Sequence, residues 1–138
     1  MQGGSIPFLC VLVVHMIAAV FWTGDSLLIA RSGPPAVKGL AVAQGGAATV
    51  TIILGAVLWH AAHGDRVGRP EQILSVVAVV SIIAAVIQQA IAWPARFAAS
   101  RAAPGSGTGA VARAVVAERS ATALLAMALA LVVVVRYA

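Results

Sequence analysis

Hydrophobic residues along the chain gather in four long runs that polar positions interrupt only briefly. The runs cover about 6–29, 40–62, 73–93 and 120–136. A bilayer core about 30 Å thick needs roughly 20 helical residues to cross it. Because every backbone polar group must be paired inside lipid, the pattern predicts an all-α, four-helix transmembrane bundle. The whole chain, residues 1–138, is then a single transmembrane domain.

The connections between the runs each contain Pro or Gly, which favour breaks between helices. They read RSGPPAVKG, HGDRVGRPEQ and PARFAASRAAPGSGTGAVARAVVAER. The third, rich in Gly, Ala and Arg, is predicted to be the flexible segment. The amino-terminal MQGGS carries no positive charge and no cleavage site follows it, so the first run is predicted to stay in the mature protein.

Composition places the chain in a membrane, since 62% of its residues are hydrophobic and only 9% are charged. A soluble domain carries about 25% charged residues. The net charge of +5 comes from residues that flank the runs, so it does not indicate nucleic acid. One cysteine, Cys10, excludes an internal disulfide. Nucleotide-dependent and hydrolase chemistry are excluded as well, because their glycine-rich and nucleophile motifs do not occur.

The basic residues are distributed unevenly between the two ends of the runs. Connections one and three hold Arg31, Lys38, Arg96, Arg101, Arg113 and Arg119, and the opposite side holds Arg66, Arg69 and Arg136. Cytoplasmic loops carry the excess of Lys and Arg. The bias predicts a multi-pass protein of a bacterial-type inner or plasma membrane with both termini outside; the inverted orientation is the alternative.

Polar side chains in the first run pose a separate question, because lipid tolerates them poorly. The positions are His15, Trp22, Asp25 and, on the same helix face, the apolar Ile29. An ionisable group that faced lipid would cost about 2.5–3.5 kcal/mol on insertion scales. This face is therefore predicted to point into the bundle.

Glutamines of the second and third runs fall at the depth of Asp25. They are Gln44, Gln88 and Gln89. We expect Asp25 to join Gln44 and one of the other two glutamines in a buried polar layer that reaches Arg96 or Arg119. Two interpretations of this layer stay open, a structural set of hydrogen bonds and a proton path or ligand pocket.

The position of His15 near the middle of the first run permits two roles. It is either a packed residue bonded to a carbonyl or an axial ligand of a haem or metal. His60 lies about 9 Å away in depth, which disfavours it as the second ligand. Met127 has the matching depth and methionine is a known axial partner, although it could equally serve packing alone.

A second cluster of histidines, WHAAHGD, lies at the end of the second run. His60 and His63 share one helix face, and Asp65 follows closely. A bound Zn²⁺ or Cu²⁺ fits this spacing, and ordinary interfacial polar residues are the alternative.

The first run resembles a known helix, on the stretch HMIAAVFWTGDSLLIAR with His15-x6-Trp22-x8-Arg31. It is similar to the first helix of the HemJ-type membrane protoporphyrinogen IX oxidases and of the wider CopD-like group of small integral membrane proteins. TVTIILGAVLW resembles the second helix of that family. AERSATALLAMALALVVVVRYA resembles the last, where Glu118 matches a glutamate that heads the helix. The resemblance implies a four-helix scaffold and His15 as a ligand of haem b.

The chain departs from the family pattern at several positions. Gln72 stands near the place of the lysine proposed there as the other haem ligand. Ala117 replaces an asparagine and Ser120 a proline on either side of the matched glutamate. TGDS replaces a glycine pair after the tryptophan and thereby adds Asp25.

Three functions follow from these observations, and the sequence leaves open whether the chain is an enzyme. The first is a haem b redox protein that acts on a lipophilic substrate, with His15, Trp22 and Met127 at the cofactor. The second is a non-catalytic subunit of a larger membrane complex, or a homo-oligomer. The third is a CopD-like copper or metal handling protein that uses His60, His63 and Met127. In each case the bilayer is a partner and nucleic acid is not.

Overall fold

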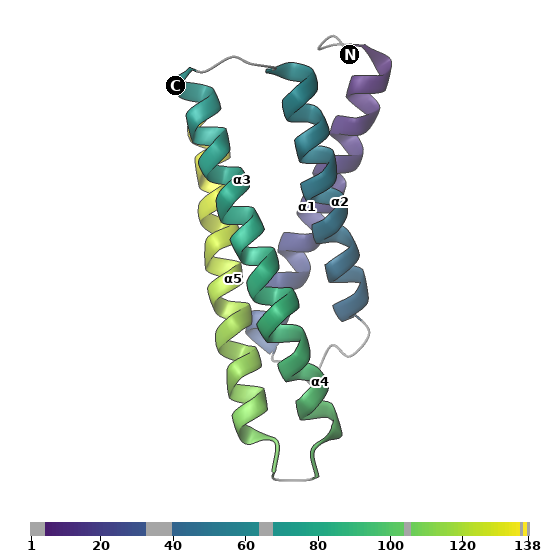
Figure 1. Ribbon diagram of the computed structural model, residues 1–138, viewed down its shortest axis with the longest axis vertical. Coiled ribbons are helices and arrows are strands. Elements are labelled where there is room, and N and C mark those ends of the chain that lie inside the picture. The colour runs from purple at the N-terminus through teal and green to yellow at the C-terminus, as the bar shows by residue number, and fades with distance from the viewer. Residues whose placement is uncertain (1–4, 33–39, 64–67, 104–105, 136, 138) are drawn as a thin grey trace.

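The computed structural model describes residues 5–32, 40–63, 68–103, 106–135 and 137, and these form helices with short connections. The elements are α1 (Ile6–Ser32), α2 (Leu40–Ala62), α3 (Arg69–Ile87), a π-helical turn η2 (Gln88–Ala92), α4 (Trp93–Arg101) and α5 (Thr108–Val135). Since α3, η2 and α4 follow one another without a break, they make one span, Arg69–Arg101. The described part of the chain is thus an all-α bundle of four long helices (Figure 1).

Two antiparallel pairs build the bundle, α1 with α2 and α3 with α5. The pairs meet mainly where α1 packs against α5, whereas α2 touches α3 only lightly. The first described helix begins, and the last one ends, at the same end of the bundle (Figure 1). All four spans are long and apolar enough to cross a bilayer, which defines a multi-pass membrane protein.

Long apolar side chains cover the outside of the bundle, as expected where the helices face lipid rather than water. Val42, Val20 and Val133 are 78%, 67% and 63% exposed. The interior is built from small residues instead, and Trp22 is the one aromatic side chain in the main buried cluster. Alanines at the interface let helix backbones approach closely, which is how transmembrane helices gain packing energy.

The prediction of a flexible third connection is wrong for most of its length. Helix α4 continues the third span as far as Arg101, and α5 begins at Thr108, not near residue 120. Alanine and arginine, which fill this stretch, are strong helix formers. Only the short segment between Arg101 and Thr108, which contains PGSG, interrupts the helices.

The π-helical turn explains how the third span continues through Pro94. A proline removes one backbone donor and its ring collides with the carbonyl four residues earlier. Here the Trp93 N–H bonds to the Gln88 carbonyl, five residues back, so the turn is widened just before the proline. Such π turns occur mostly as single insertions, and frequently at functional sites. This one takes up an extra residue between Gln88 and Arg96, which both face the interior.

Removal of the extra residue tests the importance of this turn. Deletion of Ala90, which is exposed, would rotate α4 by about 100° relative to α3. Arg96 would then leave the interior, with a loss of unfolding free energy of about 3–5 kcal/mol, as for a broken buried ion pair. Unfolding in detergent micelles measures the loss, and Ala90→Leu, which keeps the register, is the control. A deletion variant as stable as the control would contradict the role given to the π turn.

Candidate functional site

A buried carboxylate forms the centre of the polar layer. Glu118 on α5 is fully buried, and its Oε1 lies 2.6 Å from Nη2 of Arg96 on α4. A lone ionised carboxylate inside a protein is very costly, so it needs both an opposite charge and hydrogen-bond donors. Arg96 supplies the charge, and its side chain is only 10% exposed.

Two glutamine side chains supply the donors. Gln44 on α2 and Gln88 in η2 each donate from Nε2 to Glu118 Oε2, at 3.4 and 3.2 Å. Gln44 also accepts a hydrogen bond of 2.8 Å from Arg96 Nη2 at its Oε1. Both glutamines are 1% exposed. The carboxylate is therefore surrounded by groups from α2, η2 and α4.

Helix α1 joins the layer through Trp22 and Ser26. The indole Nε1 of Trp22 donates to Gln88 Oε1 at 2.6 Å. The Ser26 hydroxyl accepts from Gln44 and Gln88, at 3.1 and 2.8 Å, and donates to the Trp22 carbonyl. Thr122 of α5 adds a bond of 3.1 Å to the Ser26 carbonyl. All four spans thus meet in one connected set of hydrogen bonds, the polar layer.

The expectation that Asp25 is the acid of this layer is wrong. Asp25 is 8% exposed, but no hydrogen bond joins it to Gln44 or Gln88, and its Oδ2 has no partner among the described residues. Ser26, the next residue, points to the two glutamines instead. The helix therefore turns its hydroxyl, not its carboxylate, toward Glu118.

Of the alternatives left open for the layer, Gln89 and Arg119 lie outside it, whereas Gln88 and Arg96 lie within it. Gln89 is exposed, and its side chain rests against Gly45 of α2, where an added Cβ would lie 2.9 Å from Gln89 Nε2. Arg119 is also exposed, so Arg96 is the arginine that the layer contains. Neighbouring positions on a helix point about 100° apart, which separates each of these residues from its buried neighbour.

His15 lies between α1 and α2, where it is half-buried. Its Nδ1 is 3.0 Å from the backbone carbonyl of Thr51. A carbonyl only accepts, so Nδ1 carries the proton and Nε2 keeps its lone pair. Gly55 makes room for the ring, because a Cβ there would lie 3.2 Å from Cε1 of His15. The imidazole is held in one tautomer by α2.

Trp22 and Met127, the other two residues named as cofactor contacts, differ in exposure. Trp22 is buried at 1% exposure, about two helical turns from His15 on α1, and its indole N–H is bonded within the polar layer. Met127 is 46% exposed and lies off the buried face of α5. The pairing of His15 with Met127 stays a prediction.

The histidine cluster lies at the carboxyl-terminal end of α2, and its metal site stays a prediction. His60 is exposed, and the ring of His63 lies 5.2 Å from that of Trp59. The expected third ligand, Asp65, lies outside the described residues. Among the residues that the structure describes, no group of three or more His, Cys, Asp or Glu could hold a metal ion.

Glu118 is the residue that the spacing pattern missed, because the pattern places it in the third connection, ahead of the fourth run. The sequence does carry a signal for a buried Glu118. The inward positions on either side of it recur with a helical period; they are Ala114, Ala117, Ala121 and Leu125. Ser26 carried no comparable signal. A serine within an apolar run usually bonds back to its own helix, as the Ser26 hydroxyl does to Trp22.

Comparisons of the chain with protein-family models, with curated proteins and with solved structures found no match. The class of the protein, a multi-pass helical membrane protein, therefore rests on the four apolar spans. Among the described residues, two groups are candidates for chemistry: the imidazole of His15 and the ion pair of the polar layer. Nε2 of His15 has no hydrogen-bond partner among the described residues. Arg96 and Glu118, in contrast, are bonded to each other and to Gln44 and Gln88.

The ion pair gives a direct test of what holds the bundle together. We expect Arg96→Met to cost about 3–5 kcal/mol of unfolding free energy, because it leaves the buried Glu118 charge uncompensated. Glu118→Gln combined with Arg96→Met removes that charge and should recover a substantial part of the loss. Unfolding of the unmodified protein and of these two variants in detergent micelles makes the comparison. A double variant no more stable than Arg96→Met would show that the charge is not what destabilises the protein.

Proposed function

We propose that the chain is a haem b protein of a bacterial-type inner membrane, with His15 as an axial ligand. The observation that carries the proposal is the hydrogen bond between His15 Nδ1 and the Thr51 carbonyl. Ligating histidines almost always donate their second ring N–H to a carbonyl, carboxylate or water, which fixes the tautomer and orients the ring. This leaves Nε2 as the ligand atom, and the absence of a side chain at Gly55 lets the ring pack against α2.

The donor set fits a haem with one protein ligand. Met127 and His60 are both exposed, so of the candidate ligands the proposal assigns only His15 to the haem. A single proximal histidine is sufficient in globins and peroxidases. The resemblance of the first helix to the HemJ-type oxidases supports the same residue. When bound, haem would supply one-electron chemistry to a lipophilic substrate such as a porphyrin or a quinone.

The residues of this chain would contribute orientation and electrostatics. Thr51 and Gly55 would set the ring of His15 from the side of α2. The polar layer lies about two helical turns further along α1, where Trp22 is bonded to Gln88. It would fix α1 relative to the other spans and hence the height of His15 in the membrane.

A second candidate, a subunit of a larger membrane complex, is favoured by the surface of α1. The buried residues of this helix are Trp22, Asp25, Ser26 and Ile29, all in its carboxyl-terminal half. The amino-terminal half has no buried residue within this chain, so lipid or another subunit covers it. A partner there would bury a face that includes the exposed Cys10.

Absorption spectroscopy separates these candidates. Gently purified protein supplied with haem should show a Soret band, and His15→Ala should abolish it while the helical circular dichroism stays unchanged, because a half-buried ring contributes few packing contacts. His60→Ala, at the exposed end of α2, is the control and should keep the band. Absence of a Soret band in the unmodified protein would refute haem binding. Elution at a mass well above that of one chain in its micelle would then support the subunit function.

The sidedness of the protein is the remaining part of the proposal. We propose that the connections after α1 and after α4 are cytoplasmic and that both termini are outside. Six basic residues favour this orientation, and five still do so after Arg96 is assigned to the interior, against three on the opposite side.

Labelling of single cysteines tests this orientation. In a Cys10→Ala background, an impermeant thiol reagent added to intact cells should label Tyr137→Cys and leave Ser106→Cys unlabelled until the membrane is opened. Tyr137 is 85% exposed and Ser106 is also exposed, so both sites are accessible to the reagent from their own side. Labelling of Ser106→Cys alone in intact cells would establish the inverted orientation.

A further inference from the structure

Asp25 is a carboxyl group inside the bundle that the polar layer does not use. It is 8% exposed, and its Oδ2 is buried without a hydrogen-bond partner among the described residues. Its neighbours on the buried face of α1 include Trp22 and Ile29, each about one turn away. Most buried polar atoms in proteins are bonded, so each exception needs a physical reason. Inside a membrane, a residue of this kind usually marks an ion or proton site.

No basic side chain in the described part of the chain compensates a charge on Asp25. Helix α1 packs mainly against α2 and α5. Helix α2 carries no Asp, Glu, Lys or Arg, and its His60 lies near its carboxyl-terminal end. The other charged residues of α1, α4 and α5 are Arg31, Arg96, Arg101, Arg113, Glu118 and Arg119. The one ion pair among the described side chains joins Arg96 and Glu118, so an ionised Asp25 has no counter-charge there.

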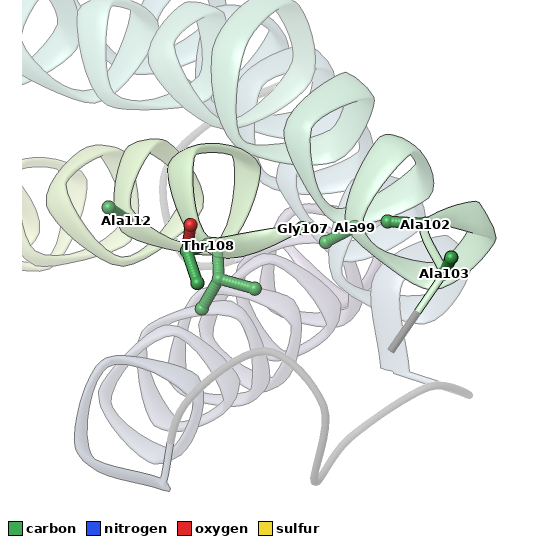
Figure 2. A pocket seen from close by; sticks show the side chains of 7 residues that line it. Ala99, Ala102, Ala103, Gly107, Thr108 and Ala112 are labelled. Carbon is green, nitrogen blue, oxygen red and sulfur yellow. The ribbon is translucent and has the colours of Figure 1, made fainter. Parts of the chain in front are cut away.

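Two cavities of the bundle are not lined by Asp25. One, of about 480 Å³, lies between α4 and α5 and is lined by small residues such as Ala99 and Gly107 (Figure 2). The other is lined by residues that include Arg69 and Tyr137. The described residues also contain no group of three or more His, Cys, Asp or Glu that could hold a metal ion. A proton is the ligand that fits this carboxyl without a cavity or further ligating groups.

The helix around Asp25 offers hydrogen-bond acceptors but no free donors. Inside an α-helix each backbone N–H bonds to the carbonyl four residues earlier, and each carbonyl keeps a second lone pair. Thr23 and Ser26 use such lone pairs, because their hydroxyls each donate at 2.8 Å to the carbonyl four residues earlier. A carboxylate only accepts, whereas a carboxylic acid has one O–H to donate. Only a protonated Asp25 can therefore bond to its own helix in the same way, with the Phe21 carbonyl as acceptor.

We propose that Asp25 is a reversible proton-binding site inside the membrane domain and that it holds its proton at neutral pH. The proton comes from water at the end of the bundle where α1 ends, about 10 Å from Asp25 along the helix. It forms an O–H bond with a carboxylate oxygen, and no other covalent bond changes. The neutral acid avoids the cost of an unpaired charge in an apolar bundle. The site is independent of His15 and of haem.

Carbon-13 NMR of the full chain in detergent micelles tests the proposal, because the shift of a carboxyl carbon reports its ionisation. The chain has two aspartates, so Asp65→Asn leaves Asp25 as the only labelled one. Its signal should have the shift of a neutral acid at pH 7, where an exposed aspartate is only about 0.1% protonated. It should move to the carboxylate shift at alkaline pH while the helical circular dichroism is retained.

A matched control moves the carboxyl to the surface. Ser106 is exposed between α4 and α5, so Ser106→Asp in a chain without the two native aspartates should give a carboxylate signal at pH 7. A carboxylate signal from Asp25 at pH 7 would overturn the proposal, because it would require a basic partner that the described residues do not supply. A neutral signal that persists until the protein unfolds would overturn it as well, because the proton would then not exchange in the folded protein.

Unfolding of Asp25→Asn provides a second, independent measurement. Asparagine has the shape of the neutral acid and an N–H that can donate to the same carbonyl. The unfolding midpoint at pH 7 should therefore stay unchanged. A marked decrease would indicate that the native carboxyl is ionised and paired, which would contradict the proposed proton site.

Discussion

The carboxylate of Glu118, enclosed without exposure in an apolar bundle, is the constraint on which the rest of this structure depends. An ionised group in that position is tolerated only with a counter-charge and further donors. Arg96, Gln44 and Gln88 provide them, and each comes from a different segment of the chain. The position of one side chain thereby fixes how three helical segments lie around α5.

The π turn and the small interior residues follow from the same requirement. Gln88 and Arg96 both reach Glu118 from one continuous span, and the widened turn between them brings them to the same side. The interior around the polar layer is filled mostly by alanines, so helix backbones come close enough for short side chains to bond across the bundle. Apolar packing alone would leave many rotations of these helices nearly equal in energy, because lipid is as apolar as the helix faces.

The two ends of the bundle differ in how tightly the helix pairs are joined. The polar layer ties both pairs together in the half that contains Trp22 and Glu118. His15 lies about two turns away and is held by α2 alone, through Thr51 and the space at Gly55. The proposed function rests on His15, whose bond to the Thr51 carbonyl leaves Nε2 as the ligand atom, and not on the ion pair.

The sequence by itself determined the class of the protein, because length and apolarity of the runs leave only membrane-spanning helices. It also indicated that Gln44 and one of Gln88 and Gln89 are buried, since amides in such runs must find partners. It did not determine the acid: Asp25 and Glu118 are both carboxylates near basic residues, and only helix rotation decides which one meets Arg96. That rotation is set where the spans pack against one another, at contacts between segments far apart in the chain. Spacing along one helix carries no information about such contacts, so tertiary structure alone decided the polar layer.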